Sequence, residues 1–424
     1  MTHFGVICPT GSHLTTCFSL AFELQKRGHQ ITFLNVLDVQ DQVLAANFGF
    51  RAIGETIYPI GVRARLEEDI GKLSGMAALK KTLKMVEQDL QAILQDAPSV
   101  IETEEIQALL VDQCSPVGGM VADFLNIPFI SLCNALPLNR EISLPPAFTS
   151  WQYSPTWNAK LRNQAAYTLF NFLAKPIRTL IDEYRQQWKL RPYSHPNDNF
   201  SQLAQLSQQP VEFEFPRANL PLYFHFTGPY HSSIGREAVS FPWDQLTGKP
   251  LVYASMGTIQ NRLFPVFETI AAACVGLEVQ LVIALGGGTQ EDMTSLPGSP
   301  LVVRYAPQLE LLKKAALTIT HAGLNTALES LTHGVPMVAI PIANDQPGVA
   351  ARIVWSGAGE MIPVSRLTVD GLRLMIQKVL TQDSYKAQAL RLRSSIENSG
   401  GVNQAATVIE SAIAAGKPVF RSAS

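Results

Sequence analysis

Short runs of apolar and β-branched residues recur along the chain and alternate with segments in which apolar residues return every three or four positions. The first pattern is typical of strands buried on both faces, and the second is typical of helices. Strands are therefore expected at residues 4–8, 30–36, 108–112, 129–133 and 223–227, and then at residues 251–255, 280–285, 301–305, 317–320 and 337–340. Because strands and helices alternate, we predict an α/β fold with parallel sheets.

Two stretches interrupt this alternation. Residues 229–249 contain Pro, Gly and Ser and have weak periodicity, which is typical of a linker. Residues 139–192 are rich in aromatic side chains and have mostly helical spacing. We therefore predict two doubly wound domains, residues 1–228 and 250–398. In such domains, ligands bind at the carboxyl ends of the strands.

The composition narrows the functional classes. Of the 424 residues, 46% are hydrophobic and 16% are charged, and the net charge is −2. This balance is typical of a folded protein and argues against a nucleic-acid partner. The five cysteines form no Cys-x-x-Cys pair, so we expect a reducing, cytoplasmic location without disulfides or structural zinc. The N-terminal apolar run has no basic region before it and is predicted to be a strand, not a signal peptide.

Several common motifs are missing from the sequence. Gly11 is the only glycine in the turn after the first predicted strand, and the glycines at 286–288 lack the spacing of a dinucleotide fingerprint. The chain has no P-loop lysine, no Gly-x-Ser-x-Gly elbow, no His-Glu-x-x-His and no Asp-x-Asp pair. We therefore expect neither a bound cofactor nor a metal.

One stretch near the C-terminus has the pattern of a phosphate site. A predicted strand ends before His321, and a helix is expected to begin near Gly323, where its free N–H groups suit a phosphate. His321, Asn325 and Glu329 are spaced four apart and share a helix face, which fits a nucleotide sugar. Alternatively, Thr326 and Glu329 form a capping box, the helix begins at Ala327, and His321 is a core residue. The residues alone leave both interpretations open.

The segments YAPQLELL and HAGLNTALESLTHGVPMVAIPIANDQ resemble the donor-binding signature of the inverting UDP-dependent glycosyltransferases. The resemblance extends over the whole chain and implies the GT-B fold, in which two Rossmann-like domains face each other across a cleft. It also implies that the first domain binds the acceptor and the second the UDP-sugar. A C-terminal helix and tail, residues 399–424, is then expected to return to the first domain.

The resemblance also assigns roles to single residues. Tyr305 would stack on uracil, where many members have Trp, and the backbone of Ala306 would contact the base. The remaining donor-site roles are ribose binding by Gln308 and Glu329, diphosphate binding by His321, Gly323, Asn325 and Thr326 with Ser255 and Thr258 beside it, and sugar binding by Asp345 and Gln346.

His13 is the candidate general base. It follows the first strand, and a neutral imidazole accepts a proton from a hydroxyl near neutral pH. Asp112 ends another strand and is the candidate partner that orients the imidazole. Taken separately, His13 is equally typical of an exposed residue near a helix N-cap, and Asp112 of a loop residue that caps a helix near Ser115. The family positions favour the pair.

The N-terminal half also resembles, more specifically, the carotenoid glucosyltransferases of bacteria, in the segments VDQCSPVGGMVADFLNIPFISLCNALPLNRE and FPRANLP. This implies transfer of a hexose, glucose by expectation, to a lipophilic alcohol, a xanthophyll such as zeaxanthin. The residues expected to line the acceptor groove are Asn134, Leu136, Phe148 and Trp151. The alternatives are another lipophilic acceptor (a macrolide, sterol or flavonoid) and a binding protein without turnover.

Residues 60–85 combine lysines with regularly spaced apolar residues. This pattern predicts either a peripheral membrane contact or a solvated amphipathic helix.

Overall fold

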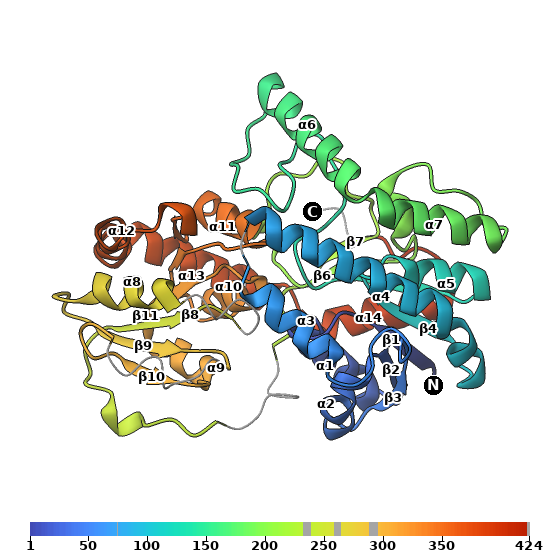
Figure 1. Cartoon of the computed structure of the whole chain (residues 1–424), viewed down its shortest axis with the longest axis horizontal. Coiled ribbons are helices and arrows are strands. Elements are labelled where there is room, and N and C mark those ends of the chain that lie inside the picture. The colour runs from blue at the N-terminus through green and yellow to red at the C-terminus, as the bar shows by residue number, and fades with distance from the viewer. Residues whose placement is uncertain (74, 232–238, 258–263, 288–295, 422–424) are drawn as a thin grey trace.

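The computed structural model describes residues 1–73, 75–231, 239–257, 264–287 and 296–421, and it consists of two lobes (Figure 1). The N-terminal lobe holds a seven-stranded sheet in the order β3-β2-β1-β4-β5-β6-β7. All of its pairings are parallel. Its strands are β1 (His3–Ile7), β2 (Gln30–Asn35), β3 (Gly49–Ala52), β4 (Ala108–Asp112), β5 (Phe129–Cys133), β6 (Gln205–Ser207) and β7 (Phe224–Phe226).

The C-terminal lobe holds a six-stranded sheet in the order β10-β9-β8-β11-β12-β13, again with parallel pairings. Its strands are β8 (Leu251–Ser255), β9 (Gln280–Ala284), β10 (Leu301–Val303), β11 (Ala315–Thr320), β12 (Met337–Ala339) and β13 (Gly359–Met361). The two sheets confirm the predicted α/β fold with two Rossmann-like lobes. The domain limits at single residues stay a prediction.

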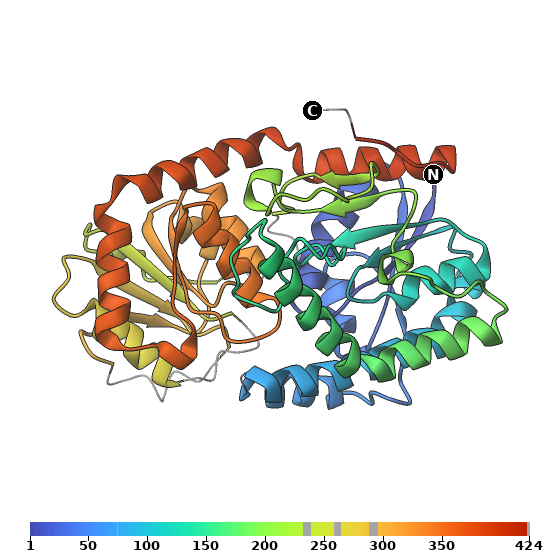
Figure 2. The same cartoon turned by 90° about the horizontal axis from the view of Figure 1, so that it is seen from above.

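Helices cover both faces of each sheet (Figure 2). Those of the N-terminal lobe are α1 (Ser12–Lys26), α2 (Gln40–Ala45), α3 (Val62–Gly71), α4 (Gly75–Thr103), α5 (Val117–Leu125), α6 (Trp157–Leu173) and α7 (Lys175–Gln187). Those that follow are α8 (Phe264–Cys274), α9 (Gln308–Leu312), α10 (Leu324–Thr332), α11 (Gln346–Trp355), α12 (Val369–Thr381), α13 (Asp383–Asn398) and α14 (Gly401–Ala415). None of the described helices combines the length and the apolar composition that a bilayer span requires.

The apolar runs predicted ten of the strands to within a few residues, but three short strands were not expected. These are β3, β6 and β13, which have three or four residues each and contain Arg51, Gln205 and Glu360. Each of them pairs with a neighbouring strand of its sheet. Neighbouring strands therefore supply the backbone hydrogen bonds that make these short, partly polar segments extended, and a single-segment pattern does not reveal this.

The C-terminal helix returns to the first lobe, as the family resemblance implies. Figure 2 shows α13 and α14 running along one edge of the molecule from the second lobe to the first. The apolar side of α14 is buried in the same core cluster as α1. Arg27, at the end of α1, donates from Nη1 to Glu410 of α14 at 2.8 Å, and His29 lies 3.0 Å from the same carboxylate. The last helix therefore fastens the second lobe to the first.

A second connection between the lobes is a buried ion pair. Arg352 of α11 donates from Nε to Glu214, which lies between β6 and β7, at 2.8 Å, and both side chains are almost completely buried. Burial raises the pKa of Glu214, but the nearby charges of Arg352 and Arg217 outweigh burial and lower it. Glu214 is therefore charged at neutral pH and ties the C-terminal lobe to the N-terminal one.

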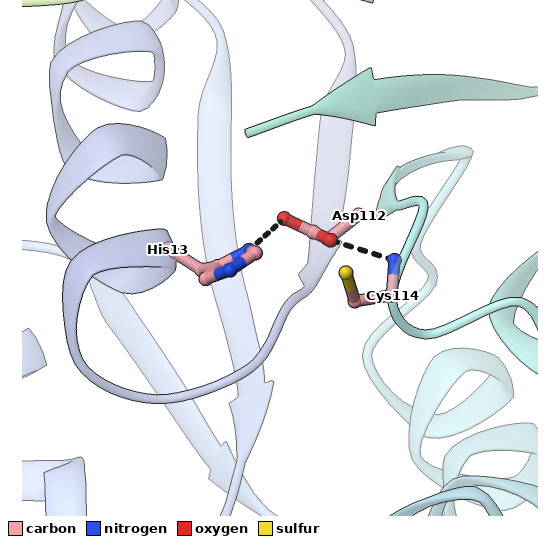
Figure 3. A group of neighbouring side chains, drawn as sticks. All are labelled: His13, Asp112 and Cys114. Atoms are coloured by element: carbon pink, nitrogen blue, oxygen red, sulfur yellow. Dashed lines mark hydrogen bonds and ion pairs between the residues drawn. The ribbon is translucent and has the colours of Figure 1, made fainter. Parts of the chain in front are cut away.

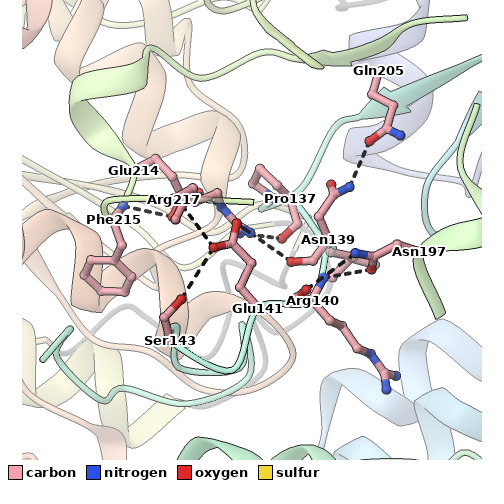
Figure 4. Close-up of polar contacts among 12 residues, drawn as sticks. Pro137, Asn139, Arg140, Glu141, Ser143, Asn197, Gln205, Glu214, Phe215 and Arg217 are labelled. Carbon is pink, nitrogen blue, oxygen red and sulfur yellow. Dashed lines mark hydrogen bonds and ion pairs between the residues drawn. The ribbon is translucent and has the colours of Figure 1, made fainter. Parts of the chain in front are cut away.

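Arg217 extends this connection to the segment after β5. Its guanidinium donates to the carbonyl oxygens of Pro137 and Asn139 at 2.9 and 2.8 Å (Figure 4). Glu141 accepts a bond from the backbone N–H of Ala218 at 3.1 Å. The irregular segment after β5 therefore owes its position to a few buried charges.

We expect Glu214→Gln to destabilise the protein by about 3–5 kcal/mol, because it leaves Arg352 buried without a counter-charge. Denaturant unfolding at pH 7 measures this loss. The folded-state pKa of Glu214 is lowered, so its contribution is present above the carboxylate's unfolded pKa of about 4.3 and is lost as pH falls through the folded value. The difference between variant and wild type should therefore shrink in acid. Glu397→Gln, in an exposed pair with Arg393, is the control and should change stability by about 0–1 kcal/mol.

Candidate active site

The side chains of His13 and Asp112 lie in contact at the carboxyl ends of the strands of the first sheet (Figure 3). His13 lies in the first turn of α1 just after β1, and Asp112 is the last residue of β4, which pairs with β1. His13 Nδ1 lies 2.8 Å from Asp112 Oδ2, where the side chain of Asp112 is 0% exposed and that of His13 is 22% exposed. The carboxylate holds the proton on Nδ1, which leaves the lone pair of Nε2 available.

Asp112 is itself fixed by two further donors. Asn134 donates from Nδ2 to Oδ2 at 2.7 Å, and the backbone N–H of Cys114 donates to Oδ1 at 2.8 Å. The alternative in which Asp112 caps a helix near Ser115 is wrong, because α5 begins at Val117 with Pro116 as its N-cap and has no side-chain cap. Asn134 was expected to line the acceptor groove. Its amide group is buried and donates to Asp112, so it positions the pair instead.

Charge from both lobes acts on His13. Burial lowers the pKa of His13, but the charge and hydrogen bond of Asp112 and the charge of Asp345 outweigh it, so the pKa is raised above its ordinary 6.5. Asp345 comes from the second lobe, where it precedes α11. Burial raises the pKa of Asp345, and the charge of His13 offsets this only in part. The imidazole of His13 is therefore coupled electrostatically to carboxylates of both lobes.

Among the residues that the structure describes, the group that could hold a metal is His13, Asp112 and Cys114, whose ligand atoms lie within 4.8 Å of one another. Both oxygens of Asp112 already accept hydrogen bonds, as described above. Burial raises the pKa of the Cys114 thiol well above its usual value, and the nearby carboxylates raise it further. The cluster is therefore satisfied as a hydrogen-bonded group with a protonated thiol.

The helix after β11 begins at Leu324 with Gly323 as its N-cap, which agrees with the phosphate-site interpretation. The capping-box alternative is wrong, because Thr326 lies inside the helix. Glu329, its supposed partner, accepts a hydrogen bond from Gln308.

The His321 ring lies between two glycines. A Cβ atom added to Gly257 would lie 2.7 Å from the ring, and one added to Gly323 would lie 2.5 Å from it. Gly323 thus makes room for the imidazole, a reason that sequence alone did not suggest. Burial lowers the pKa of His321 to about 4, although a hydrogen bond with the Ser255 backbone partly opposes it. His321 is therefore neutral at pH 7.

Gln308 and Glu329 lie together, although 21 positions separate them in the sequence. Gln308 donates to Glu329 Oε2, and its own Oε1 accepts a bond from the Tyr253 hydroxyl at 2.9 Å. Tyr253 lies in the buried strand β8 and gave no polar signal in the sequence. Tyr305 and Ala306 directly precede this group, and the Tyr305 side chain is exposed. The Arg304 guanidinium lies 5.7 Å from the centroid of the Tyr305 ring.

The other expected donor-site residues have different surroundings. Asn325 accepts from Gln208 at 2.7 Å and donates to Thr16 at 3.0 Å, so its side chain bridges to the first lobe. Gln346 Oε1 accepts the backbone N–H groups of Ile342 and Ala343 and stabilises its own loop. Ser255 is buried and Thr326 half-buried, whereas Thr258 lies outside the described residues.

The remaining residues expected in the acceptor groove lie where the segment after β5 meets α6 and α11. Leu136 is completely buried in a core cluster shared with α10 and α11. Phe148 stacks on Phe170 of α6 at 5.0 Å between ring centroids, and Trp151 lies 4.4 Å from the Arg162 guanidinium. Phe148 and Trp151 are half-buried, so they are the members of this set with accessible surface.

Two polar contacts of the site were missed at the sequence level. Gln208 donates both to the backbone of Asn134 and to Asn325, each at 2.7 Å, and so joins the support of Asp112 to α10. Gln208 follows β6, a strand that the apolar pattern did not predict. The second contact, between Cys114 and Asp112, uses a backbone N–H, which no side-chain pattern reveals.

Comparison with solved structures defines the class of protein. The chain superimposes on the glycotransferase of kitacinnamycin with a TM-score of 0.74 at 21% identity, covering 97% of this chain and 98% of that one. The calicheamicin glycosyltransferase CalG4 gives a TM-score of 0.73 at 19% identity, with coverage of 98% and 99%. The fold is therefore the GT-B fold of glycosyltransferases, as expected.

The chain belongs to the UDP-glucoronosyl and UDP-glucosyl transferase family, whose model matches residues 6–403. It is similar to the zeaxanthin glucosyltransferase of Pantoea ananas, with 33% identity over 99% of this chain and 98% of that protein. The zeaxanthin glucosyltransferase of Pseudescherichia vulneris is 30% identical over 99% of this chain and 100% of that protein. The chain is thus a glycosyltransferase that uses a nucleotide sugar.

The raised pKa of His13 predicts a pH dependence. A base must be unprotonated, so kcat/KM should fall on the acid side with an apparent pKa above 6.5. Asp112→Asn removes the charge that raises this pKa and leaves the burial that lowers it. Its acid limb should therefore move to lower pH, and kcat should fall roughly 10–100-fold because the ring loses its orientation.

Steady-state rates between about pH 5 and 9 measure both effects. Asp370→Asn, which changes an exposed carboxylate on α12, is the matched control and should keep the wild-type profile. An acid limb that does not move in Asp112→Asn would show that another group sets it.

Proposed function

We propose that the protein transfers glucose from UDP-glucose to a hydroxyl group of a xanthophyll such as zeaxanthin, with inversion at the sugar carbon. The main observation in support of this reaction is the His13–Asp112 pair. The charge of Asp345, from the other lobe, also acts on the His13 ring. The acceptor class is supported by the full-length similarity to two zeaxanthin glucosyltransferases. We place this activity in the cytoplasm, with peripheral contact to a membrane that supplies the acceptor.

The proposed step uses groups of this chain throughout. Nε2 of His13 accepts the proton of the acceptor hydroxyl while the oxygen of that hydroxyl bonds to C1 of the sugar. The bond from C1 to the diphosphate oxygen breaks at the same time, and its electron pair leaves with UDP. Asp112 stabilises the imidazolium that forms, and Asn134 and Cys114 keep that carboxylate in position.

The donor site that we propose lies at the start of α10. The N–H groups of its first turn, with His321, face the leaving diphosphate and stabilise its growing charge. Gln308 and Glu329 hold the ribose, and Tyr305 stacks on the base. Asp345 binds a sugar hydroxyl close to His13. It would therefore place the sugar of the donor next to the general base. Asn325 would donate to the diphosphate from Nδ2, which now donates to Thr16 and to the carbonyl oxygen of Ser12, so this contact replaces one of those bonds when the donor binds.

The test is a product assay by mass spectrometry with zeaxanthin in detergent and UDP-glucose. We expect a glucoside, and we expect His13→Ala to lower kcat by about 10²–10⁴-fold because the base is lost. The affinity for UDP, measured by calorimetry, should stay close to the wild-type value in this variant.

Parallel reactions keep the parts of the proposal separate. dTDP-glucose replaces the donor in one, since a related fold has been solved as the glycosyltransferase VinC in complex with dTDP. A flavonol replaces zeaxanthin in the other. Transfer only to the flavonol would refute the acceptor, transfer only from dTDP-glucose would refute the donor, and UDP release independent of any acceptor would refute the transferase step.

We also expect the reaction to need no metal ion. The proposed diphosphate site relies on helix N–H groups and uncharged side chains, and the Asp112 carboxylate is already satisfied. Activity should therefore survive excess EDTA in an assay with purified enzyme. Loss of activity that Mg²⁺ or Mn²⁺ restores would show that a cation takes part.

A further inference from the structure

The outward face of α6 carries four large apolar side chains, with the exposed polar residues Asn158 and Thr168 between them. Trp157, Leu161, Leu169 and Phe172 have exposed fractions of 73%, 59%, 57% and 74%. At 100° per residue these four positions fall within an arc of about 120° on the helix. We call these four side chains the α6 face. Large apolar side chains grouped on one exposed face mark a surface that contacts something apolar.

The opposite face of α6 is already occupied. Ala159 and Asn163 are buried, and Asn163 donates from Nδ2 to the carbonyl oxygen of Ile142 at 3.1 Å. Phe170, on the same side, stacks on Phe148. The orientation of the helix is therefore fixed from inside. In Figure 1 α6 projects beyond the two lobes, and in Figure 2, which is seen from above, it lies in front of them.

The charges on α6 and in the first turn of α7 are positive, and the nearest acids are Glu141 and Asp182, of which Asp182 pairs with Arg178 at 3.7 Å. Residues 142–181 contain no Asp or Glu, whereas they contain Lys160, Arg162, Lys175 and Arg178. Lys160 and Arg162 flank the apolar arc on its two sides, and Lys175 and Arg178 follow its end. A cavity of about 530 Å³ beside the helix is lined by Lys160, Arg140 and His195, together with a single acid, Glu141. Positive charge beside exposed Trp, Leu and Phe is the pattern of helices that lie in an anionic membrane interface.

Residues 60–85, the segment first considered for membrane contact, have different surroundings. Leu73 packs against the core of the second sheet. Lys72 and Lys81 form ion pairs with the carboxylate of Asp69. Part of the apolar surface and part of the positive charge of this segment are therefore used in contacts within the protein, whereas Lys80 and Lys84 are exposed.

We propose that the α6 face is a docking surface for an anionic phospholipid bilayer, into whose interface Trp157, Leu161, Leu169 and Phe172 insert. The lysines and arginines around it then contact the lipid phosphates. Because Phe148 and Ile142 lie directly beneath α6, docking places the segment next to the active site at the membrane surface. This last point rests on the proposed lipophilic acceptor, whereas the docking itself does not.

The experiment is sedimentation of the full chain with vesicles of phosphatidylcholine alone or mixed with phosphatidylglycerol, without donor or acceptor. The wild type should pellet with the anionic vesicles, and less so at high salt. Leu161→Gln/Leu169→Gln/Phe172→Gln should bind at least tenfold more weakly, and Lys160→Glu/Lys175→Glu should lose the preference for anionic lipid. Since all these side chains are exposed, thermal unfolding should remain close to that of the wild type.

Leu222→Gln/Leu374→Gln, which changes two exposed leucines elsewhere on the chain, is the matched control and should bind like the wild type. The proposal is overturned if the wild type does not bind anionic vesicles or if the triple variant binds them equally well. It is also overturned if light scattering shows a dimer that the triple variant loses, because the face would then contact a second copy. No sugar transfer is measured, so these outcomes are independent of the proposed reaction.

Discussion

The buried pair of Glu214 and Arg352 is the contact on which the relation between the two lobes depends. It joins a segment of the first lobe to a helix of the second, and water has almost no access to either charge. Such a pair is costly to bury and more costly to break, so it fixes a relative position more than it adds stability. Arg217 shares the same acid and also holds the backbone after β5. The charges of Glu214, Arg352 and Arg217 thus hold the two lobes together and also fix the course of the segment after β5.

The reactive pair depends on that approach. His13 and Asp112 both come from the first lobe, yet the charge on His13 is also set by Asp345 from the second. Gln208 and Asn325 add a polar link between the support of Asp112 and the start of α10. A change in the distance between the lobes would alter the basicity of His13 as well as the space for a donor. In this architecture the protonation of the base and the position of the two lobes are coupled.

The irregular segment after β5 connects this site to the periphery. Its start supports Asp112 through Asn134, its middle is held by Arg217, and its end lies under α6 through Phe148. The inner face of α6 is used for this packing, and its outer apolar face is left exposed. The same segment therefore spans the distance from the base to the surface that we propose to meet the lipid.

The sequence by itself determined the layers of the fold and the principal chemical groups. β4, β5 and β8 begin and end where their apolar runs predict, because a continuous run of buried residues is a local property. The signature around His321 and Glu329 was equally local, and family resemblance gave its meaning. Only the tertiary structure decided how single residues are used. Asn134 was expected to line the acceptor groove but donates a hydrogen bond to Asp112. Gly323 leaves space for the ring of His321. The short strands β3, β6 and β13 and the polar link through Gln208 depend on partners far away in the chain. These contacts are fixed by packing in three dimensions, so no pattern within one segment can encode them.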